Sequence, residues 1–299
     1  METAATLLAG GFLNDYLLSV LLGIVEGLTE FLPVSSTAHL RICEKLMHIS
    51  LDSAYWKMYS IVIQLGAILA LMLLFLPRIV MFFRTFPEGE RGKNTVMTHP
   101  ITLTLVAFVC TSGPSLLMIK RIGHNLESLK VMALALIIGG IVMWIVDRMS
   151  ERHEPSTTNL EEMSLGQAIW IGLCQVFSAV IPGTSRSMST IAAGQIVGMS
   201  RPAALEFSFL LSIPTMLAAT GYSLVKALHP SIAAGDTLTP LVMTGHNWIV
   251  LAIGFVVSFF VALVVVEWFL VWVRDHGFVP FAVYRIIVGS WVLYLALHG

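Results

Sequence analysis

The sequence predicts an all-α polytopic membrane protein with an inverted-topology repeat, in which each half is a re-entrant helix hairpin followed by three transmembrane helices. Two observations lead to this prediction. Of the 299 residues, 57% are hydrophobic and only 12% are charged, whereas a soluble domain carries about 25% charged residues. Residues 23–36 also align without a gap on residues 172–185, so the chain contains two related segments. The apolar runs are too long for barrel strands of about 10 residues.

Six apolar segments are long enough to cross a bilayer, which takes about 20 helical residues. Three follow the first related segment and three follow the second. They are 56–76, 100–119 and 129–146 in the first half, and 205–226, 248–271 and 279–297 in the second. Because three is an odd number of crossings, the second half must be inserted upside down relative to the first.

Two further apolar segments, 16–48 and 165–197, are each interrupted by a proline and several hydroxyl residues. Backbone freed by such a break is tolerated at membrane depth only where it is buried in protein or lines a cavity. We therefore expect two re-entrant hairpins that meet near the midplane; ordinary proline-kinked spans are the alternative. The chain 1–299 is then a single membrane domain, with repeats 1–148 and 164–299 joined by a linker at 149–163.

Two carboxylates lie in the first hairpin. Glu26 and Glu30 are four residues apart, so on a helix they share one face. Carboxylates inside an apolar segment are costly and are functional candidates by default. They suit either a divalent cation with oxygen ligands, such as Mg²⁺ or Ca²⁺, or acid–base chemistry. Bonding to the backbone at the helix break is the alternative.

Three consecutive hydroxyl residues, Ser35, Ser36 and Thr37, follow Pro33 and precede His39. Alone, they would be interpreted as a helix N-cap. His39 is within one helical turn of Ser36, and a hydroxyl beside an imidazole is a minimal activated nucleophile. The segment is therefore a candidate for nucleophilic catalysis.

The second hairpin carries Arg186 in place of a histidine. Hydroxyl and amide groups at a helix N-terminus bind anions, and the planar guanidinium of Arg186 suits phosphate. Gly183 permits close approach of the backbone. Arg186 is expected to bind a ligand phosphate or to pair with a glutamate, the candidates being Glu26, Glu30 and Glu206.

The remaining charges are weaker signals. Arg285 and Glu267 lie in late spans, where they are expected to pair with each other or to extend toward the interface. The net charge is −1, so the chain has no basic field of the kind that attracts nucleic acid.

Residues 26–39 and 182–190 together closely resemble the two signature motifs of the bacitracin-resistance type undecaprenyl-diphosphate phosphatase family. Segments 63–66, 206–211 and 280–285 extend the resemblance over nearly the whole chain. Two positions depart from the family pattern: Ala38 stands where a glycine is frequent, and Met188 where a small residue is usual. Neither departure removes a reacting group.

The resemblance implies a multi-pass enzyme of the bacterial inner membrane. It would hydrolyse undecaprenyl diphosphate, recycle the lipid carrier for peptidoglycan synthesis, confer bacitracin resistance and use a divalent cation, Mg²⁺ or Ca²⁺. By the same resemblance, Ser36 is the nucleophile, His39 assists it and Arg186 grips the diphosphate, while Glu26 and Glu30 serve the metal or the proton. The substrate-binding residues would be Ser35, Thr37, Gly183, Thr184, Ser185 and Ser187.

The sequence alone leaves open which group attacks the phosphorus, whether the protein is an enzyme or a transporter, and how the chain assembles. An activated water is an alternative to Ser36 as the attacking group. A polyprenyl-phosphate flippase, with or without hydrolysis, is an alternative to the enzyme, because inverted repeats with broken helices are typical of transporters. The crowding of Ser36, His39 and Glu30 in one loop favours the enzyme over both a carrier and a structural scaffold. The expected partners are the polyprenyl diphosphate and the bilayer, with a homodimer among the options for assembly.

Overall fold

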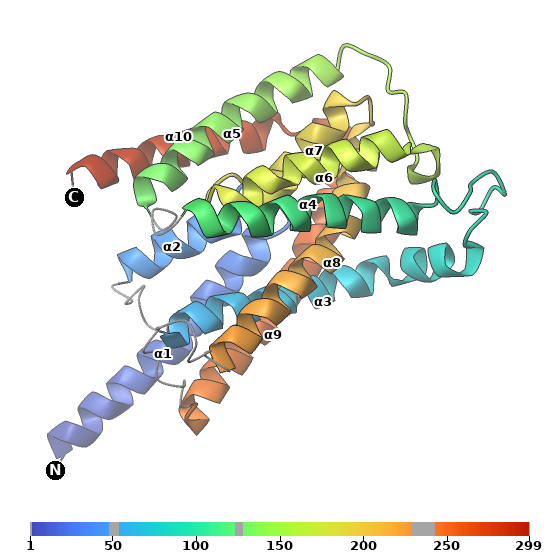
Figure 1. The fold of residues 1–299 in the computed structure, drawn as a ribbon. Helices are drawn as coiled ribbons and strands as arrows, with labels where there is room; N and C mark the ends of the chain where they lie inside the picture. Colours follow the sequence, from blue (N-terminus) through green and yellow to red (C-terminus); the bar gives the residue numbers. More distant parts are fainter. Residues whose placement is uncertain (1, 48–53, 123–127, 229–242, 299) are drawn as a thin grey trace.

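The computed structural model describes residues 2–47, 54–122, 128–228 and 243–298, and in these ranges the regular structure is helical. Apart from one isolated bridge between Thr157 and Met199, no strand pairing occurs in the described ranges. The prediction of an all-α protein is thereby confirmed (Figure 1). The helices are α1 Glu2–Thr29, α2 Ser36–Leu46, α3 Ala54–Thr85, α4 Pro100–Ile122, α5 Leu129–Ser150, the 3-10 helix η2 Leu160–Glu162, α6 Leu165–Val180, α7 Arg186–Ile196, α8 Arg201–Leu228, α9 Gly245–His276 and α10 Val279–His298.

Each of the six predicted spans lies on a helix that is long and apolar enough to cross a membrane, namely α3, α4, α5, α8, α9 and α10. The chain is therefore a multi-pass membrane protein. Helix α3 extends beyond the predicted span 56–76 and continues past Pro77 to Thr85. Beyond the proline, Arg78 is held by Glu206 at 2.7 Å and Phe82 is buried in the core. These tertiary contacts outweigh the hydrogen bond that proline removes from the helix.

Both predicted helix breaks are present. The first break, residues 30–35, separates α1 from α2, and the second break, residues 181–185, separates α6 from α7. Helices α2 and α7 have 11 residues each, about half of what a bilayer crossing needs. Helix α1 begins at Glu2, well before the predicted start of the hairpin at residue 16. Insertion of the two hairpins from opposite faces stays a prediction.

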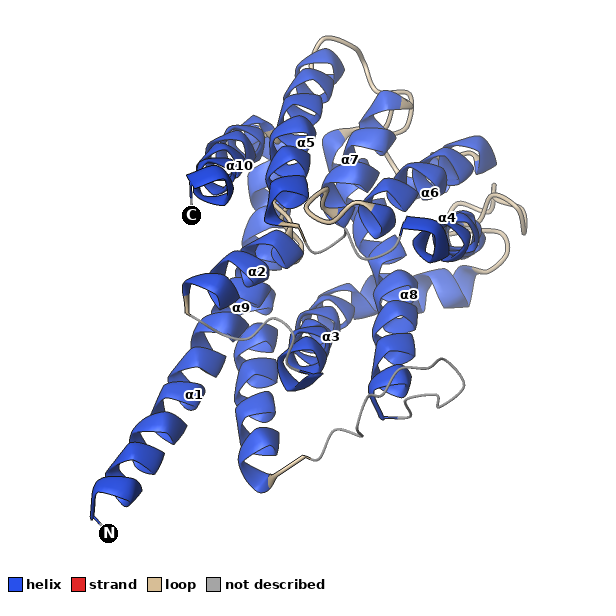
Figure 2. Ribbon diagram, turned by 60° about the vertical axis from the view of Figure 1, so that its left-hand side comes forward, coloured by secondary structure: helices blue, strands red, loops and turns tan. Residues whose placement is uncertain are grey.

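Helices of one half pack against helices of the other half. Helix α1 of the first half packs along α9 of the second, and α6 of the second half packs along α4 of the first (Figure 2). The repeated glycines explain both contacts. A Cβ on Gly23 would lie 2.7 Å from the carbonyl oxygen of Gly254 in α9, and a Cβ on Gly172 would overlap the carbonyl oxygen of Ala107 in α4. The related segments thus dock equivalent helices against the opposite half.

The linker 149–163 is held by the loop that follows α3. Arg91 forms an ion pair with Glu162 at 3.2 Å, and Thr158 donates both its backbone N–H and its hydroxyl to the same carboxylate at 3.1 Å. These hydrogen bonds, that of the Thr158 backbone first, lower the pKa of Glu162 from its ordinary value. The linker is therefore fixed to the helices at this end of the molecule.

Candidate active site

The two breaks restart their helices in the same way. Ser35 and Ser185 have positive φ angles of 74° and 71°, and each hydroxyl accepts the N–H of the residue three positions later, Ala38 or Met188. This is the side-chain contact of a helix N-cap, on a backbone conformation that is uncommon outside glycine. The two serines are therefore structurally equivalent.

This equivalence corrects the gapless alignment of the repeats. The alignment pairs Pro33 with Pro182, but it also pairs Ser36 with Ser185, which is wrong by one residue. The second break contains one more residue between its proline and its N-cap than the first. As a result, Ser36 and Arg186 occupy the same structural position, the first residue of α2 and of α7.

Gly183 meets two backbone requirements of the second break. Its φ of 91° is one that side-chain-bearing residues rarely adopt. A Cβ at this position would also lie 2.6 Å from the carbonyl oxygen of Met132 in α5. The second break thus passes directly against the backbone of α5.

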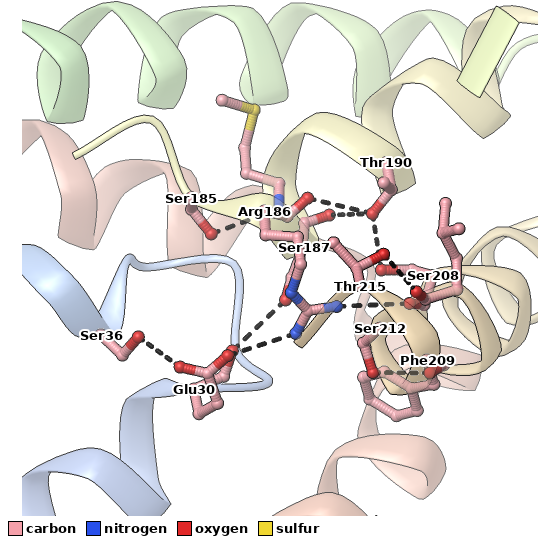
Figure 3. A network of polar contacts seen from close by, with 12 residues as sticks. Glu30, Ser36, Ser185, Arg186, Ser187, Thr190, Ser208, Phe209, Ser212 and Thr215 are labelled. Atoms are coloured by element: carbon pink, nitrogen blue, oxygen red, sulfur yellow. Dashed lines mark hydrogen bonds and ion pairs between the residues drawn. The ribbon is translucent and has the colours of Figure 1, made fainter. Parts of the chain in front are cut away.

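Glu30 joins the two breaks. Its carboxylate accepts the hydroxyl of Ser36 at 2.5 Å through Oε2 and a guanidinium N–H of Arg186 at 3.4 Å through Oε1. Figure 3 shows both contacts converging on this one side chain. The carbonyl of Glu30 also accepts the hydroxyl of Ser187 at 3.4 Å. A hydroxyl, a carboxylate and a guanidinium from segments about 150 residues apart therefore form one cluster.

Arg186 has further partners behind the carboxylate. Its other terminal nitrogen donates to the carbonyl of Ser208 in α8 at 3.4 Å (Figure 3), and the guanidinium lies 5.9 Å from the ring centroid of Phe31. Of the three glutamates that the sequence left open as partners, Glu30 is the one that pairs with Arg186. Glu206 instead pairs with Arg78.

A cavity of about 360 Å³ opens in front of this cluster. Seven of the residues predicted for the site line it: Glu30, Ser35, Ser36, Thr37, Gly183, Ser185 and Arg186. Sequence reasoning missed four polar residues that also line it, Gln64, Gln175, Ser178 and Thr215. A signal existed for Gln175, which aligns with Glu26, and for Gln64, which lies in one of the segments that carry the family resemblance.

Four predicted site residues do not line this cavity; Glu26 is one of them and is described below. Ser187 is buried behind Glu30, and Thr184 lines a separate apolar cavity of about 510 Å³ between α5, α6 and α7. His39 is the fourth. Its Nδ1 bonds the carbonyl of Ser35 at 2.7 Å, and its Nε2 bonds the hydroxyl of Tyr284 at 2.8 Å.

The two hydrogen bonds of His39 determine which ring nitrogen carries the hydrogen in this conformation. Because the carbonyl of Ser35 can only accept, Nδ1 carries the hydrogen, and in the neutral ring Nε2 accepts from Tyr284. Neither nitrogen contacts Ser36. The base that the Ser36 hydroxyl actually contacts is Glu30.

Glu26 lies one helical turn before Glu30 and is fully buried. Neither of its carboxylate oxygens has a hydrogen-bond partner among the described residues. An unpartnered buried carboxylate beside a second one is a donor set that fits a cation with oxygen ligands, such as Mg²⁺ or Ca²⁺. Within the described ranges no group of three His, Cys, Asp or Glu side chains is placed to hold a metal, so hydroxyl, water or ligand oxygens would have to complete the coordination.

Comparison with known proteins identifies the family of the chain. Residues 19–291 match the model of the family described as Bacitracin resistance protein BacA. The chain is 64% identical over 285 residues to the undecaprenyl-diphosphatase of Koribacter versatilis, covering 95% of this chain and 99% of that protein. It is 41% identical to the undecaprenyl-diphosphatase of Caldanaerobacter subterraneus (92% and 94% covered) and 39% identical to that of Rhizobium etli (95% and 98%). With nearly its whole length matched, the chain belongs to the Bacitracin resistance protein BacA family.

Proposed function

We propose that this chain is an integral membrane phosphatase that hydrolyses undecaprenyl diphosphate to undecaprenyl phosphate and phosphate. The observation that carries the proposal is the cluster of Ser36, Glu30 and Arg186, which lines one cavity in an apolar helical protein. The names of the relatives support the same substrate and reaction. Because those relatives are bacterial, the site of action would be the bacterial inner membrane, where the product serves again as the lipid carrier for peptidoglycan synthesis.

The contact between Ser36 and Glu30 supports a specific first step. Glu30 accepts the hydroxyl proton while Ser36 Oγ attacks the outer phosphorus, in line with the bridging oxygen. The Oγ–P bond forms, the bond from phosphorus to the bridging oxygen breaks, and undecaprenyl phosphate leaves. A water then hydrolyses the phosphoserine, releasing phosphate and returning the proton to Ser36. Direct attack by a water that Glu30 deprotonates uses the same base and gives the same products.

The positively charged group of the site is the guanidinium of Arg186, which directly follows the second break. Arg186 already contacts the carboxylate that accepts the proton, so an entering phosphate would meet both the guanidinium and the first N–H groups of α2 and α7. Preorganised donors of this kind stabilise the charge that develops on the transferring phosphoryl group. A cavity of about 360 Å³ is at the small end of ligand pockets, which suits a diphosphate head with its prenyl chain left in the bilayer.

Glu26 and Glu30 are the residues that would hold a divalent cation, Mg²⁺ or Ca²⁺. Such an ion supplies charge neutralisation for the diphosphate when it is bound. The protein side of that site is the buried carboxylate of Glu26, whose two oxygens have no hydrogen-bond partner among the described residues. Binding of a cation there would give a role to the second carboxylate beside the one that contacts Ser36.

Phosphate release from undecaprenyl diphosphate by the purified protein in detergent tests the proposal. A detergent sample has no compartments, so released phosphate can only come from hydrolysis. We expect steady turnover that a chelator abolishes and that Mg²⁺ or Ca²⁺ restores. The opposite result would be a protein that releases no phosphate under any metal condition, yet moves polyprenyl phosphate across the bilayer of proteoliposomes. The protein would then be a transporter and the proposed enzymatic function would be wrong.

A further inference from the structure

Arg285 in α10 is fully buried, and its guanidinium contacts backbone carbonyl groups rather than an acid. Neither arrangement expected from the sequence occurs: Glu267 is exposed on α9, and the fully buried Arg285 neither pairs with it nor extends toward the interface. Nη1 instead donates to the carbonyl oxygen of Pro33 at 3.0 Å, and the two N–H groups of Nη2 are shared among the carbonyl oxygens of Ala135 at 3.1 Å, Gly183 at 3.1 Å and Thr184 at 3.0 Å.

Three of these four carbonyls belong to the two breaks. Pro33 lies in the first break, Gly183 and Thr184 lie in the second, and Ala135 belongs to α5. One side chain therefore ties together the two loops that carry Ser36 and Arg186. The planar fork of arginine reaches several acceptors in fixed directions, which the single ammonium of lysine does not.

The bound carbonyls also set the direction of the peptide groups that follow them. In a trans peptide the C=O of one residue and the N–H of the next point in opposite directions. Because the carbonyl of Thr184 points at Arg285, the N–H of Ser185 points away from it. Ser185 lines the reaction cavity, and α7 begins at the next residue. Arg285 thus binds carbonyl groups of both breaks without itself lining the cavity.

We propose that Arg285 is a positioning residue for the hydrolysis: by gripping the carbonyls of both breaks, it holds the N-termini of α2 and α7 in register around one diphosphate. This inference rests on the proposed function. The chemistry at the phosphorus stays with Ser36, Glu30 and Arg186, and Arg285 fixes how far apart and in which direction they lie. A misplacement of about 1 Å in such a site costs about 10²-fold in rate.

Gly139 in α5 offers a way to disturb Arg285 without replacing it. A Cβ on Gly139 would overlap Nη2 of Arg285 and would lie 2.7 Å from Cε of Met188. Gly289 in α10 provides a matched control in the same interface between α5 and α10. A Cβ there would meet the carbonyl oxygen of Ala133 and side-chain atoms of Leu136 and Ile137, each at 2.9 Å, and would not approach the guanidinium.

The experiment measures kcat, KM and the melting temperature of the monodisperse protein in detergent, with undecaprenyl diphosphate as substrate. The variants are Gly139→Ala, Gly289→Ala, Arg285→Lys and Arg285→Gln. We expect Gly139→Ala and Arg285→Lys to lower kcat by about 10²-fold with KM little changed. Gly289→Ala should keep the wild-type kcat even though it lowers the melting temperature to the same extent as Gly139→Ala.

A loss of kcat in Gly139→Ala no larger than in Gly289→Ala would overturn the inference, and so would a fully active Arg285→Lys. Should the Arg285 variants fail to fold, the pair of glycine variants still decides the question. An inactive wild-type protein is a different result: it refutes the proposed function itself. An active wild type with fully active Gly139 and Arg285 variants refutes only the positioning role.

Discussion

Ser36 and Arg186 are the first residues of two equivalent helices, and both contact the carboxylate of Glu30. The two helix breaks share a backbone, with an N-cap serine at positive φ in each. Their first helical residues have diverged into a hydroxyl on one side and a cation on the other. Two related loops thereby supply two different chemical groups to one cavity, a hydroxyl and a guanidinium.

Replacing His39 should lower kcat for phosphate release less than replacing Glu30 does. Both ring nitrogens of His39 are engaged by Ser35 and Tyr284, away from Ser36, whereas Glu30 accepts the Ser36 hydroxyl. Loss of a general base costs about 10²–10⁴-fold in rate. We therefore expect Glu30→Gln to fall in that range and His39→Gln to fall below it. Kinetics of phosphate release measure both; a larger kcat loss in His39→Gln than in Glu30→Gln would reinstate the histidine as the base.

Gln175 lines the cavity at the repeat position that corresponds to Glu26. Its amide nitrogen donates to the hydroxyl of Thr215 at 3.2 Å, and its amide oxygen has no partner among the described residues. A second negative charge here would oppose an anionic substrate. We expect Gln175→Glu to raise KM by about tenfold, or about 1.4 kcal/mol, over Gln175→Leu, which removes the amide without adding charge. Equal KM values for the two variants would mean that the diphosphate does not approach this wall.

Gly172 tests the contact of α6 with the opposite half. An added methyl would overlap the backbone of α4 at Ala107, which cannot move as a side chain can. We expect Gly172→Ala to destabilise the protein by about 1–3 kcal/mol. The control is Gly113→Ala in α4, where nothing lies within 4 Å of the new methyl group. Thermal melting in detergent compares the two, and a Gly172→Ala variant as stable as Gly113→Ala would contradict the tight packing of these helices.

Glu162 predicts a pH dependence in the linker. Its pKa is lowered, first by the backbone N–H of Thr158, so its contribution to stability is present above its ordinary pKa of about 4.3. That contribution is lost as the pH falls through the lower folded-state pKa. We expect Glu162→Gln to melt at a lower temperature than the wild type at neutral pH and at the same temperature in strong acid. A difference that persists undiminished in acid would assign the effect to something other than this carboxylate.

The features that could be predicted from the sequence are those that depend on neighbouring residues in the chain. The apolar runs predicted the six helices that, within the described ranges, are long and apolar enough to cross a membrane, because a helix satisfies its own backbone hydrogen bonds in lipid. The prolines at positions 33 and 182 predicted the breaks, because proline removes a helical hydrogen bond. The motif pair predicted that Glu30, Ser36 and Arg186 belong together, and these three do meet.

What escaped prediction depends on three-dimensional partners. The register of the repeat failed by one residue because the second break has one more residue between its proline and its N-cap serine than the first. The direction of His39 is set by Tyr284, which lies 245 positions away in the chain. The partners of Arg285 are backbone carbonyls, which every residue carries and no motif marks.

The most direct test of the central claim is a double-mutant cycle on phosphate release, with Ser36→Ala, Arg186→Gln and the double variant. If both residues act on one phosphate, each single change should lower kcat/KM by about 10²-fold or more, and the double variant should be little worse than the poorer single variant, because residues that act as a unit are strongly non-additive. Losses that multiply in full would place the two residues at separate tasks, and undiminished activity in either single variant would contradict the account outright.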